Sequence, residues 1–205
     1  MIAIIDYGMG NVGSIKNMFS RIGVKSVITS KEEDILICDG IVLPGVGAFD
    51  KAINNLSNLF LFKTLNEIAL NNIKPILGIC LGMQIMAKFS EEGTIKGLGW
   101  FDAKVKKFDF SEDCKNLKIP HMGWNNLILK KKSKLISDEN IKARYYFVHS
   151  YYFSPNESKD ILAMTEYGPE FACAIEKGNL FGVQFHPEKS HKYGMKILKN
   201  FSNII

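Results

Sequence analysis

The first half of the chain alternates short apolar runs with amphipathic segments. The β-branched run at 2–5 is typical of a buried parallel strand. Apolar residues at spacings of three and four then predict a helix over 14–22, which Gly23 ends. The same reasoning predicts strands over 24–30, 40–43 and 75–79, a helical stretch through Leu70, and a helix that continues from Cys80 to Phe89.

The second half is richer in strands than in helices. Strands are predicted over 100–108, 126–129, 145–148, 161–166, 172–176 and 180–185, whereas the segment 120–124 is interpreted as a turn. A helix over 193–201 closes the pattern. We therefore expect one domain over 1–205, of α/β class. It should be a doubly wound, mostly parallel sheet flanked by helices, with an antiparallel strand-rich extension.

Three glycine-containing turns follow predicted strands, after Asp6, after Leu43 and after Ile79. Function gathers at the carboxyl ends of strands in doubly wound sheets, so these turns should converge in space. The turn after Leu43 reads Pro-Gly-Val-Gly and would present free backbone N–H groups. An oxyanion hole is the preferred role, and the missing G-K-[ST] argues against a phosphate cradle.

Cys80 lies in the sequence Gly-Ile-Cys-Leu-Gly at 78–82, which has the form of a nucleophile elbow with cysteine in place of serine. In such an elbow the backbone N–H of the following residue, here Leu81, stabilises an oxyanion. The helix that begins beyond the turn favours the thiolate. A lone cysteine is otherwise most often a small buried apolar residue, so the pentapeptide alone leaves both interpretations open.

A general base for Cys80 is available at the end of the strand predicted over 180–185. His186 follows this strand, Pro187 stops it, and Glu188 is placed to orient the imidazole. His121, His149 and His191 each have an ordinary core or surface interpretation. The histidines and cysteines lack the short paired spacing of a zinc site, so no metal is expected.

Composition narrows the class of protein further. The net charge is +5, but the only compact basic run, Lys130 to Lys132, has no interleaved aromatic residues and is interpreted as a solvated turn, with no nucleic-acid binding. No apolar segment is long enough to cross a bilayer. The four cysteines form no CxxC pair and no secretory leader is evident, so a reduced, cytoplasmic chain is expected. Cys38, Cys114 and Cys173 are expected to be packing or surface residues.

The motifs together resemble a known family. Pro-Gly-Val-Gly at 44–47, Gly-Ile-Cys-Leu-Gly-Met-Gln at 78–84 and Gly-Val-Gln-Phe-His-Pro-Glu-Lys-Ser at 182–190 look like the class I glutamine amidotransferases. Further motifs at 6–11, 119–125, 146–151 and 165–168 resemble the glutaminase subunits of imidazole glycerol phosphate synthases. This resemblance extends from the first strand to the last helix.

The resemblance implies a set of site residues. A Cys80–His186–Glu188 triad would hydrolyse glutamine to glutamate through a thioester, without a cofactor. Gly45, Val46 and Leu81 would form the oxyanion hole, and Gly47, Gln84, Ser150 and Tyr151 would bind glutamine. Ammonia would pass through a tunnel to a (β/α)8 cyclase subunit, in a heterodimer that makes imidazole glycerol phosphate and AICAR in histidine biosynthesis. The docking face would include Asn11, His121, Met122, Trp124 and Asn125, with Tyr145 beside them.

Two alternatives stay open at the level of sequence. Similar glutaminase subunits serve synthases that aminate sugars, and the motif residues do not separate these acceptors. A cysteine peptidase-like hydrolase with the same elbow is a weaker alternative, because a peptide needs an open groove whereas a free amino acid needs fixed partners for its charged ends.

Overall fold

The computed structural model describes residues 1–110, 114, 116–137 and 143–205. Its elements in chain order are β1 (Ile2–Ile5), α1 (Val12–Arg21), β2 (Ser26–Thr29), α2 (Glu32–Ile37), β3 (Gly40–Gly45), α3 (Phe49–Asn58), α4 (Leu61–Leu70), β4 (Ile76–Cys80), α5 (Leu81–Gln84), β5 (Phe89–Ser90), β6 (Ala103–Lys107), β7 (His121–Asn126), β8 (Ile128–Leu129), β9 (Arg144–His149), β10 (Tyr151–Pro155), η3 (Ser158–Asp160), β11 (Ile161–Glu166), β12 (Glu170–Lys177), β13 (Leu180–Val183), η4 (Pro187–Lys189) and α6 (His191–Ser202).

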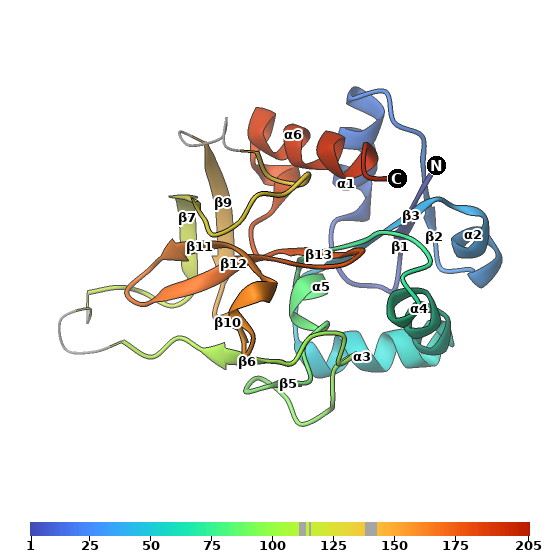
Figure 1. Cartoon of the computed structure of the whole chain (residues 1–205). Coiled ribbons are helices and arrows are strands. Elements are labelled where there is room, and N and C mark those ends of the chain that lie inside the picture. The colour runs from blue at the N-terminus through green and yellow to red at the C-terminus, as the bar shows by residue number, and fades with distance from the viewer. Residues whose placement is uncertain (111–113, 115, 138–142) are drawn as a thin grey trace.

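The main sheet has the strand order β2-β1-β3-β4-β13-β12-β10-β6-β5. The pairs from β2 through β13 are parallel, whereas β13–β12, β12–β10 and β10–β6 are antiparallel. Helices α1 and α6 cover one face of the parallel part, and α3 and α4 cover the other (Figure 1). This arrangement confirms the predicted α/β class with its antiparallel extension.

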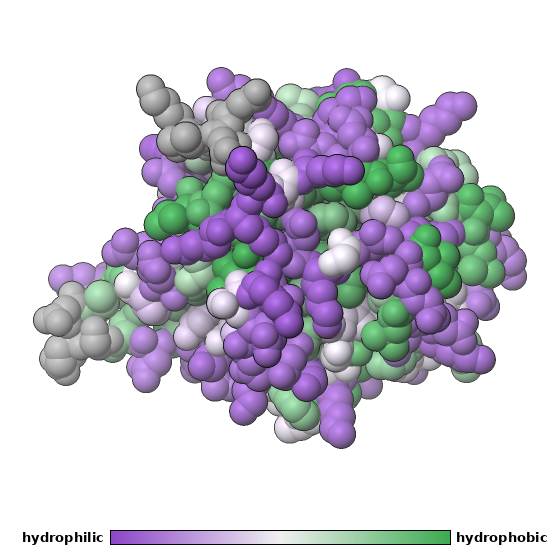
Figure 2. Space-filling model, viewed as in Figure 1, coloured by the Kyte–Doolittle hydropathy of each residue, from purple (hydrophilic) through white to green (hydrophobic). Residues whose placement is uncertain are grey.

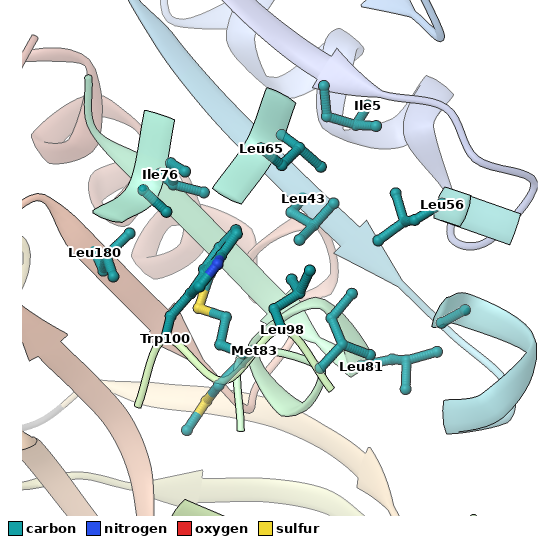
Figure 3. Close-up of a cluster of buried hydrophobic side chains, with 14 of the residues drawn as sticks. Ile5, Leu43, Leu56, Leu65, Ile76, Leu81, Met83, Leu98, Trp100 and Leu180 are labelled. Atoms are coloured by element: carbon teal, nitrogen blue, oxygen red, sulfur yellow. The ribbon is translucent and has the colours of Figure 1, made fainter. Parts of the chain in front are cut away.

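Both faces of the parallel strands are buried, which explains their nearly continuous apolar sequence. In β1, Ile2 and Ile4 belong to the core cluster under α1 and α6, whereas Ala3 and Ile5 belong to the cluster under α3 and α4. Figure 3 shows the second cluster, in which side chains from strands and from helices α3, α4 and α5 pack together, with Trp100 among them. On the face seen in Figure 2, apolar residues form separate patches within a polar surface. No helix in the described ranges is long and apolar enough to span a membrane.

Strands β7 and β9 form a separate two-stranded antiparallel sheet, in which His121 lies opposite His149 and Trp124 opposite Tyr146. The prediction of a turn over 120–124 is therefore wrong. Proline and glycine suggested a turn, but β9 supplies hydrogen-bond partners along the whole of β7. Tertiary pairing of this kind overrides local propensity.

Three further elements differ from the sequence-based expectation. Strand β10 and the short helix α2 were not predicted, and α5 ends at Gln84 instead of continuing to Phe89. The carbonyls that would extend α5 have other partners, because Leu98 and Phe101 donate their N–H groups to Ile85 and Met86. These bonds satisfy carbonyls that have no partner within the helix once it ends.

Candidate active site

Cys80 is the last residue of β4 and precedes α5 at a sharp turn. Its backbone has φ 53° and ψ −109°, a conformation that a non-glycine residue adopts only at a cost of about 1–3 kcal/mol. The turn closes only because its neighbours lack side chains. A Cβ on Gly78 would lie 2.7 Å from Gly82, and a Cβ on Gly82 would lie 1.7 Å from the Leu43 carbonyl oxygen. The backbone thus forms the predicted elbow, with Cys80 at its corner.

Cys80 lines a cavity of about 510 Å³ at the carboxyl ends of β3 and β4. This volume lies in the range of small-molecule sites. Gly47, Gln84, Ser150 and Tyr151, the predicted glutamine-binding residues, all line it together with Val46 and Leu81. The remaining lining residues are Glu92, Val148, His149 and Lys189. Residues from both halves of the chain therefore meet around the thiol.

His186 follows β13 and is held by a carboxylate. Its Nδ1 lies 2.7 Å from Oε1 of Glu188, and both side chains are almost fully buried. Its Nε2 is buried and has no hydrogen-bond partner among the described residues. Burial lowers the pKa of His186, but the neighbouring charges of Cys80 and Glu188 outweigh burial and raise it to about 10. This environment favours a protonated imidazole.

The loop that carries His186 is fastened to β9. The His186 N–H donates to the carbonyl oxygen of Tyr146 at 2.9 Å, and the Tyr146 N–H donates to Oγ of Ser190 at 3.0 Å. The Ser190 hydroxyl in turn donates to the His186 carbonyl at 2.7 Å. Strand β9 therefore fixes the backbone of His186, the residue that carries the imidazole.

A chain of carboxamides connects the cavity wall to the thiol. Nε2 of Gln84 donates to the Tyr151 carbonyl at 2.8 Å and to Oε1 of Gln184 at 3.0 Å. Nε2 of Gln184 then lies 3.6 Å from Sγ of Cys80. Sequence reasoning placed Gln84 here but missed Gln184, which is fully buried. The available signal in the sequence was an amide side chain within the predicted apolar strand, two residues before the predicted base.

Two charged residues of the cavity were also missed. Oε2 of Glu92 accepts the Phe49 N–H at 2.9 Å, and burial raises the pKa of this carboxyl. Nζ of Lys189 lies 5.5 Å from the ring centroid of Tyr146. Glu92 lies in an irregular loop that shows no motif, whereas Lys189 directly follows the predicted triad carboxylate and could have been suspected.

His149, which lines the cavity, forms a buried pair with His121. Nδ1 of His149 lies 2.8 Å from the Tyr151 carbonyl, so this nitrogen carries the proton. Nε2 of His149 then accepts from Nδ1 of His121 at 3.2 Å. Burial lowers the pKa of His149 to about 3 and that of His121 to about 4. Both imidazoles are neutral near pH 7, in fixed tautomers.

The residues expected at a docking face lie in different environments. Met122 and Trp124 are well exposed, at 61% and 44%, so Trp124 is not a core residue. The indole stacks on the ring of His191, with centroids 5.5 Å apart and planes 5° apart. His121 and Tyr145 are buried, so their side chains do not form part of a surface.

The two asparagines of this set make local hydrogen bonds. Oδ1 of Asn11 accepts the Ser14 N–H at 3.1 Å and caps α1, whereas Nδ2 of Asn125 donates to the Glu166 carbonyl at 2.7 Å. Asn11 is exposed and Asn125 is partly exposed.

The other cysteines show no comparable setting. Cys38 and Cys173 are buried, and burial raises the pKa of both thiols. Cys114 is partly exposed. In the part of the chain that the structure describes, no group of three His, Cys, Asp or Glu side chains is arranged to hold a metal ion.

Comparison with known proteins gives consistent matches. The family model "Glutamine amidotransferase class-I" matches residues 3–204. The chain is 52% identical to imidazole glycerol phosphate synthase subunit HisH 2 of Methanococcus maripaludis, over 98% of each chain. It is 43% identical to the subunit of the same name in Pseudomonas aeruginosa, over 100% of each chain. A solved structure titled as a glutamine amidotransferase superposes with a TM-score of 0.76 at 16% identity, covering 100% of this chain and 98% of the other, and so supports the fold alone.

Proposed function

Because the chain belongs to the family of class I glutamine amidotransferases, we propose that it is the glutaminase subunit of an imidazole glycerol phosphate synthase. In this role it hydrolyses glutamine and passes the ammonia to a (β/α)8 cyclase subunit in a heterodimer. The observation that carries the proposal is that Cys80 lines a cavity of about 510 Å³ and acts on the pKa of His186, whose Nδ1 lies 2.7 Å from Oε1 of Glu188.

The first step is attack of the Cys80 thiolate on the carbonyl carbon of the glutamine carboxamide. The C–O double bond becomes an oxyanion, for which the backbone N–H groups near Val46 and Leu81 are the proposed donors. Protonated His186 then gives its Nε2 proton to the leaving nitrogen, and the C–N bond breaks. Ammonia leaves and a γ-glutamyl thioester stays on Cys80.

The second step hydrolyses this thioester. Neutral His186 takes a proton from water, the resulting hydroxide attacks the thioester carbon, and the C–S bond breaks to regenerate the thiolate. Glutamate leaves with the oxygen of water. Glu188 accepts the Nδ1–H of His186 throughout, which keeps Nε2 facing the reacting atoms and stabilises the imidazolium.

The cavity also suits the charged ends of a free amino acid. Glu92 contributes a carboxylate that fits the α-ammonium group, and Lys189 contributes a cation near the α-carboxylate. Ser150, which follows β9, and Tyr151, which begins β10, line the same cavity. These fixed partners favour glutamine over a peptide, which would need an open groove.

Delivery to a partner is consistent with the chemistry of ammonia. Only the unprotonated form is nucleophilic, so a path that excludes water preserves the reactive species. The exposed apolar side chains of Met122 and Trp124 lie on the small β7–β9 sheet, whose other strand leads into the cavity wall. We therefore assign the cyclase docking face to the exposed side chains of this sheet, Met122 and Trp124, and to the turn at 6–11.

The test is glutamate release from glutamine by wild type and Cys80→Ala, each alone and with the cyclase subunit and its ribonucleotide ligand. We expect strong stimulation of wild type by the liganded cyclase and no activity in Cys80→Ala. Activity that depends on Cys80 but is indifferent to the cyclase would overturn the histidine-pathway assignment and favour an acceptor such as a sugar. Activity that survives in Cys80→Ala would overturn the mechanism.

A further inference from the structure

The side chain of Tyr7 lies in the first of the three turns at the carboxyl edge of the sheet. It follows β1 and is 1% exposed. Its hydroxyl donates a hydrogen bond of 2.5 Å to the carbonyl oxygen of Pro44, near the end of β3. The bond joins the turn after β1 to the end of β3, 37 residues away in the chain, where β3 pairs with the elbow.

The Pro44–Gly45 peptide is enclosed on several sides. A Cβ on Gly45 would lie 2.7 Å from the Tyr7 hydroxyl oxygen and 2.8 Å from Cβ of Leu81. A Cβ on Gly10 would lie 3.2 Å from the Gly45 nitrogen. Gly45 also pairs with Cys80 in the parallel ladder between β3 and β4. The Tyr7 hydroxyl therefore contacts the turn that runs beside the nucleophile.

We propose that Tyr7 is a positioning residue of the glutamine site, whose hydroxyl fixes the Pro44 peptide at the end of β3 and thereby the turn at Val46 and Gly47, which lines the same cavity as Cys80. The inference rests on the proposed glutaminase function and adds a residue to it. It does not make Tyr7 a catalytic residue, because its hydroxyl is bonded to the protein backbone.

The planarity of the peptide bond explains how one hydroxyl can act at a distance. When the Pro44 carbonyl is held, the orientation of the whole Pro44–Gly45 peptide plane is held with it. The following residues are otherwise free to rotate, since Gly45 and Gly47 lack side chains and Gly47 has φ +112°. A fixed first peptide restricts the directions in which the Val46 and Gly47 N–H groups can point. Oxyanion stabilisation depends on such preorganised donors.

The setting of Tyr7 keeps its hydroxyl a donor at all working pH values. Burial, and then the neighbouring charge of Cys80, raise the pKa of Tyr7 above its ordinary value. The phenol therefore stays protonated. Its single proton is committed to Pro44.

The chain offers a matched control in Tyr145. Its hydroxyl is also buried, but it has no hydrogen-bond partner among the described residues. Tyr7→Phe and Tyr145→Phe remove the same atom from two buried tyrosines. Among the residues that the structure describes, only the first change deletes a hydrogen bond, so the pair separates the effect of this bond from the effect of losing a buried hydroxyl.

The experiment compares two reactions of Cys80 in the full chain with its cyclase subunit. Hydrolysis of glutamine passes through an oxyanion, whereas alkylation by iodoacetamide is a displacement of iodide that forms none. We expect Tyr7→Phe to lower kcat per titratable Cys80 by about tenfold, the size of one lost hydrogen bond, and to leave the alkylation rate unchanged. Tyr145→Phe should match wild type in both reactions.

Each other outcome overturns the proposal. Equal kcat in Tyr7→Phe and wild type would show that the hydroxyl does not position the turn. An equal loss in both reactions would place the effect on the thiol, and an equal loss in both variants would make it a general effect of packing. If wild type released no glutamate, the proposed function itself would fail, which is a different result from an active wild type with an indifferent Tyr7→Phe.

Discussion

The nucleophile and the base of this site are held in place by different means. Cys80 is held by close backbone packing in the parallel half of the sheet, where a Cβ on Gly78 or Gly82 would clash. His186 is held by hydrogen bonds to Glu188 and to β9, a strand of the separate β7–β9 sheet. The elbow therefore depends on local packing, whereas the position of the base depends on a surface strand pair.

Substitution in the elbow should have the largest effect, on the fold itself. Gly82→Ala places a Cβ 1.7 Å from the Leu43 carbonyl, and we expect a loss of about 3 kcal/mol or more in the free energy of unfolding. Gly13→Ala is the control. Gly13 lies in α1, where a Cβ would meet nothing closer than 4.0 Å, so this variant should gain about 0.5–1 kcal/mol. Urea denaturation measures both, and a stable Gly82→Ala protein would contradict steric fixation.

Substitution at the base should spare the fold and reduce catalysis. Glu188→Gln keeps the shape but removes a charge that raises the pKa of His186, and we expect kcat to fall by about 10²-fold or more. In wild type the imidazole is protonated below about pH 10 and loses the proton needed by the leaving ammonia above it. The alkaline limb of the kcat profile should therefore move to lower pH in Glu188→Gln. An unmoved limb would show that another group sets it.

The surface strand pair should influence the base through Trp124 and His191. His191 has φ +47°, directly after the loop that Ser190 anchors, and its ring stacks on Trp124. We expect His191→Ala and Trp124→Ala each to lower kcat by about threefold, and the double variant to lose no more than either single one, as for residues that act together.

Phe60→Ala is the control for backbone strain, since Phe60 is also left-handed at φ 58° but is 86% exposed on another surface. The kcat of Phe60→Ala should equal that of wild type.

Fluorescence of Trp124 in a Trp100→Phe background reports the stack directly, because the chain has two tryptophans. If the losses in kcat from His191→Ala and Trp124→Ala are additive in the double variant, or if the fluorescence of Trp124 is unchanged in His191→Ala, the stack does not influence the base.

The smallest effect concerns the buried histidine pair. The pKa values of His149 and His121 lie at about 3 and about 4, below the ordinary 6.5, so the unfolded chain binds more protons. The free energy of unfolding should therefore fall as the pH falls from about 6.5 toward 4. His121→Phe keeps the stack on Tyr167 and should reduce this dependence by about one proton. Urea titrations at several pH values measure the slope, and an unchanged slope would contradict the assignment.

Much of the site could be predicted from sequence because its main constraints are local. The Gly-Ile-Cys-Leu-Gly motif determines the elbow through steric exclusion between residues 78 and 82. His186 and Glu188 are two residues apart, so their contact needs only a short turn. The alternation of apolar runs and helices likewise revealed the parallel sheet.

The remainder depends on contacts between distant segments. Strand β7 forms because β9 pairs with it, and neither partner carries a signal for the other. Gln184 reaches Cys80 across 104 residues, and Glu92 enters the cavity from a loop whose shape is set by its bond to Phe49. Packing against sequence-distant elements decides such positions, and a single sequence does not display it.

The most direct test of the account is to trap the acyl-enzyme. Wild-type protein mixed with glutamine and quenched in acid should carry a γ-glutamyl thioester on the peptide that contains Cys80. The peptides with Cys38, Cys114 and Cys173 should stay unmodified. Glutamate production with no adduct on Cys80, or with an adduct on another cysteine, would contradict a rigid elbow that presents this thiol to glutamine.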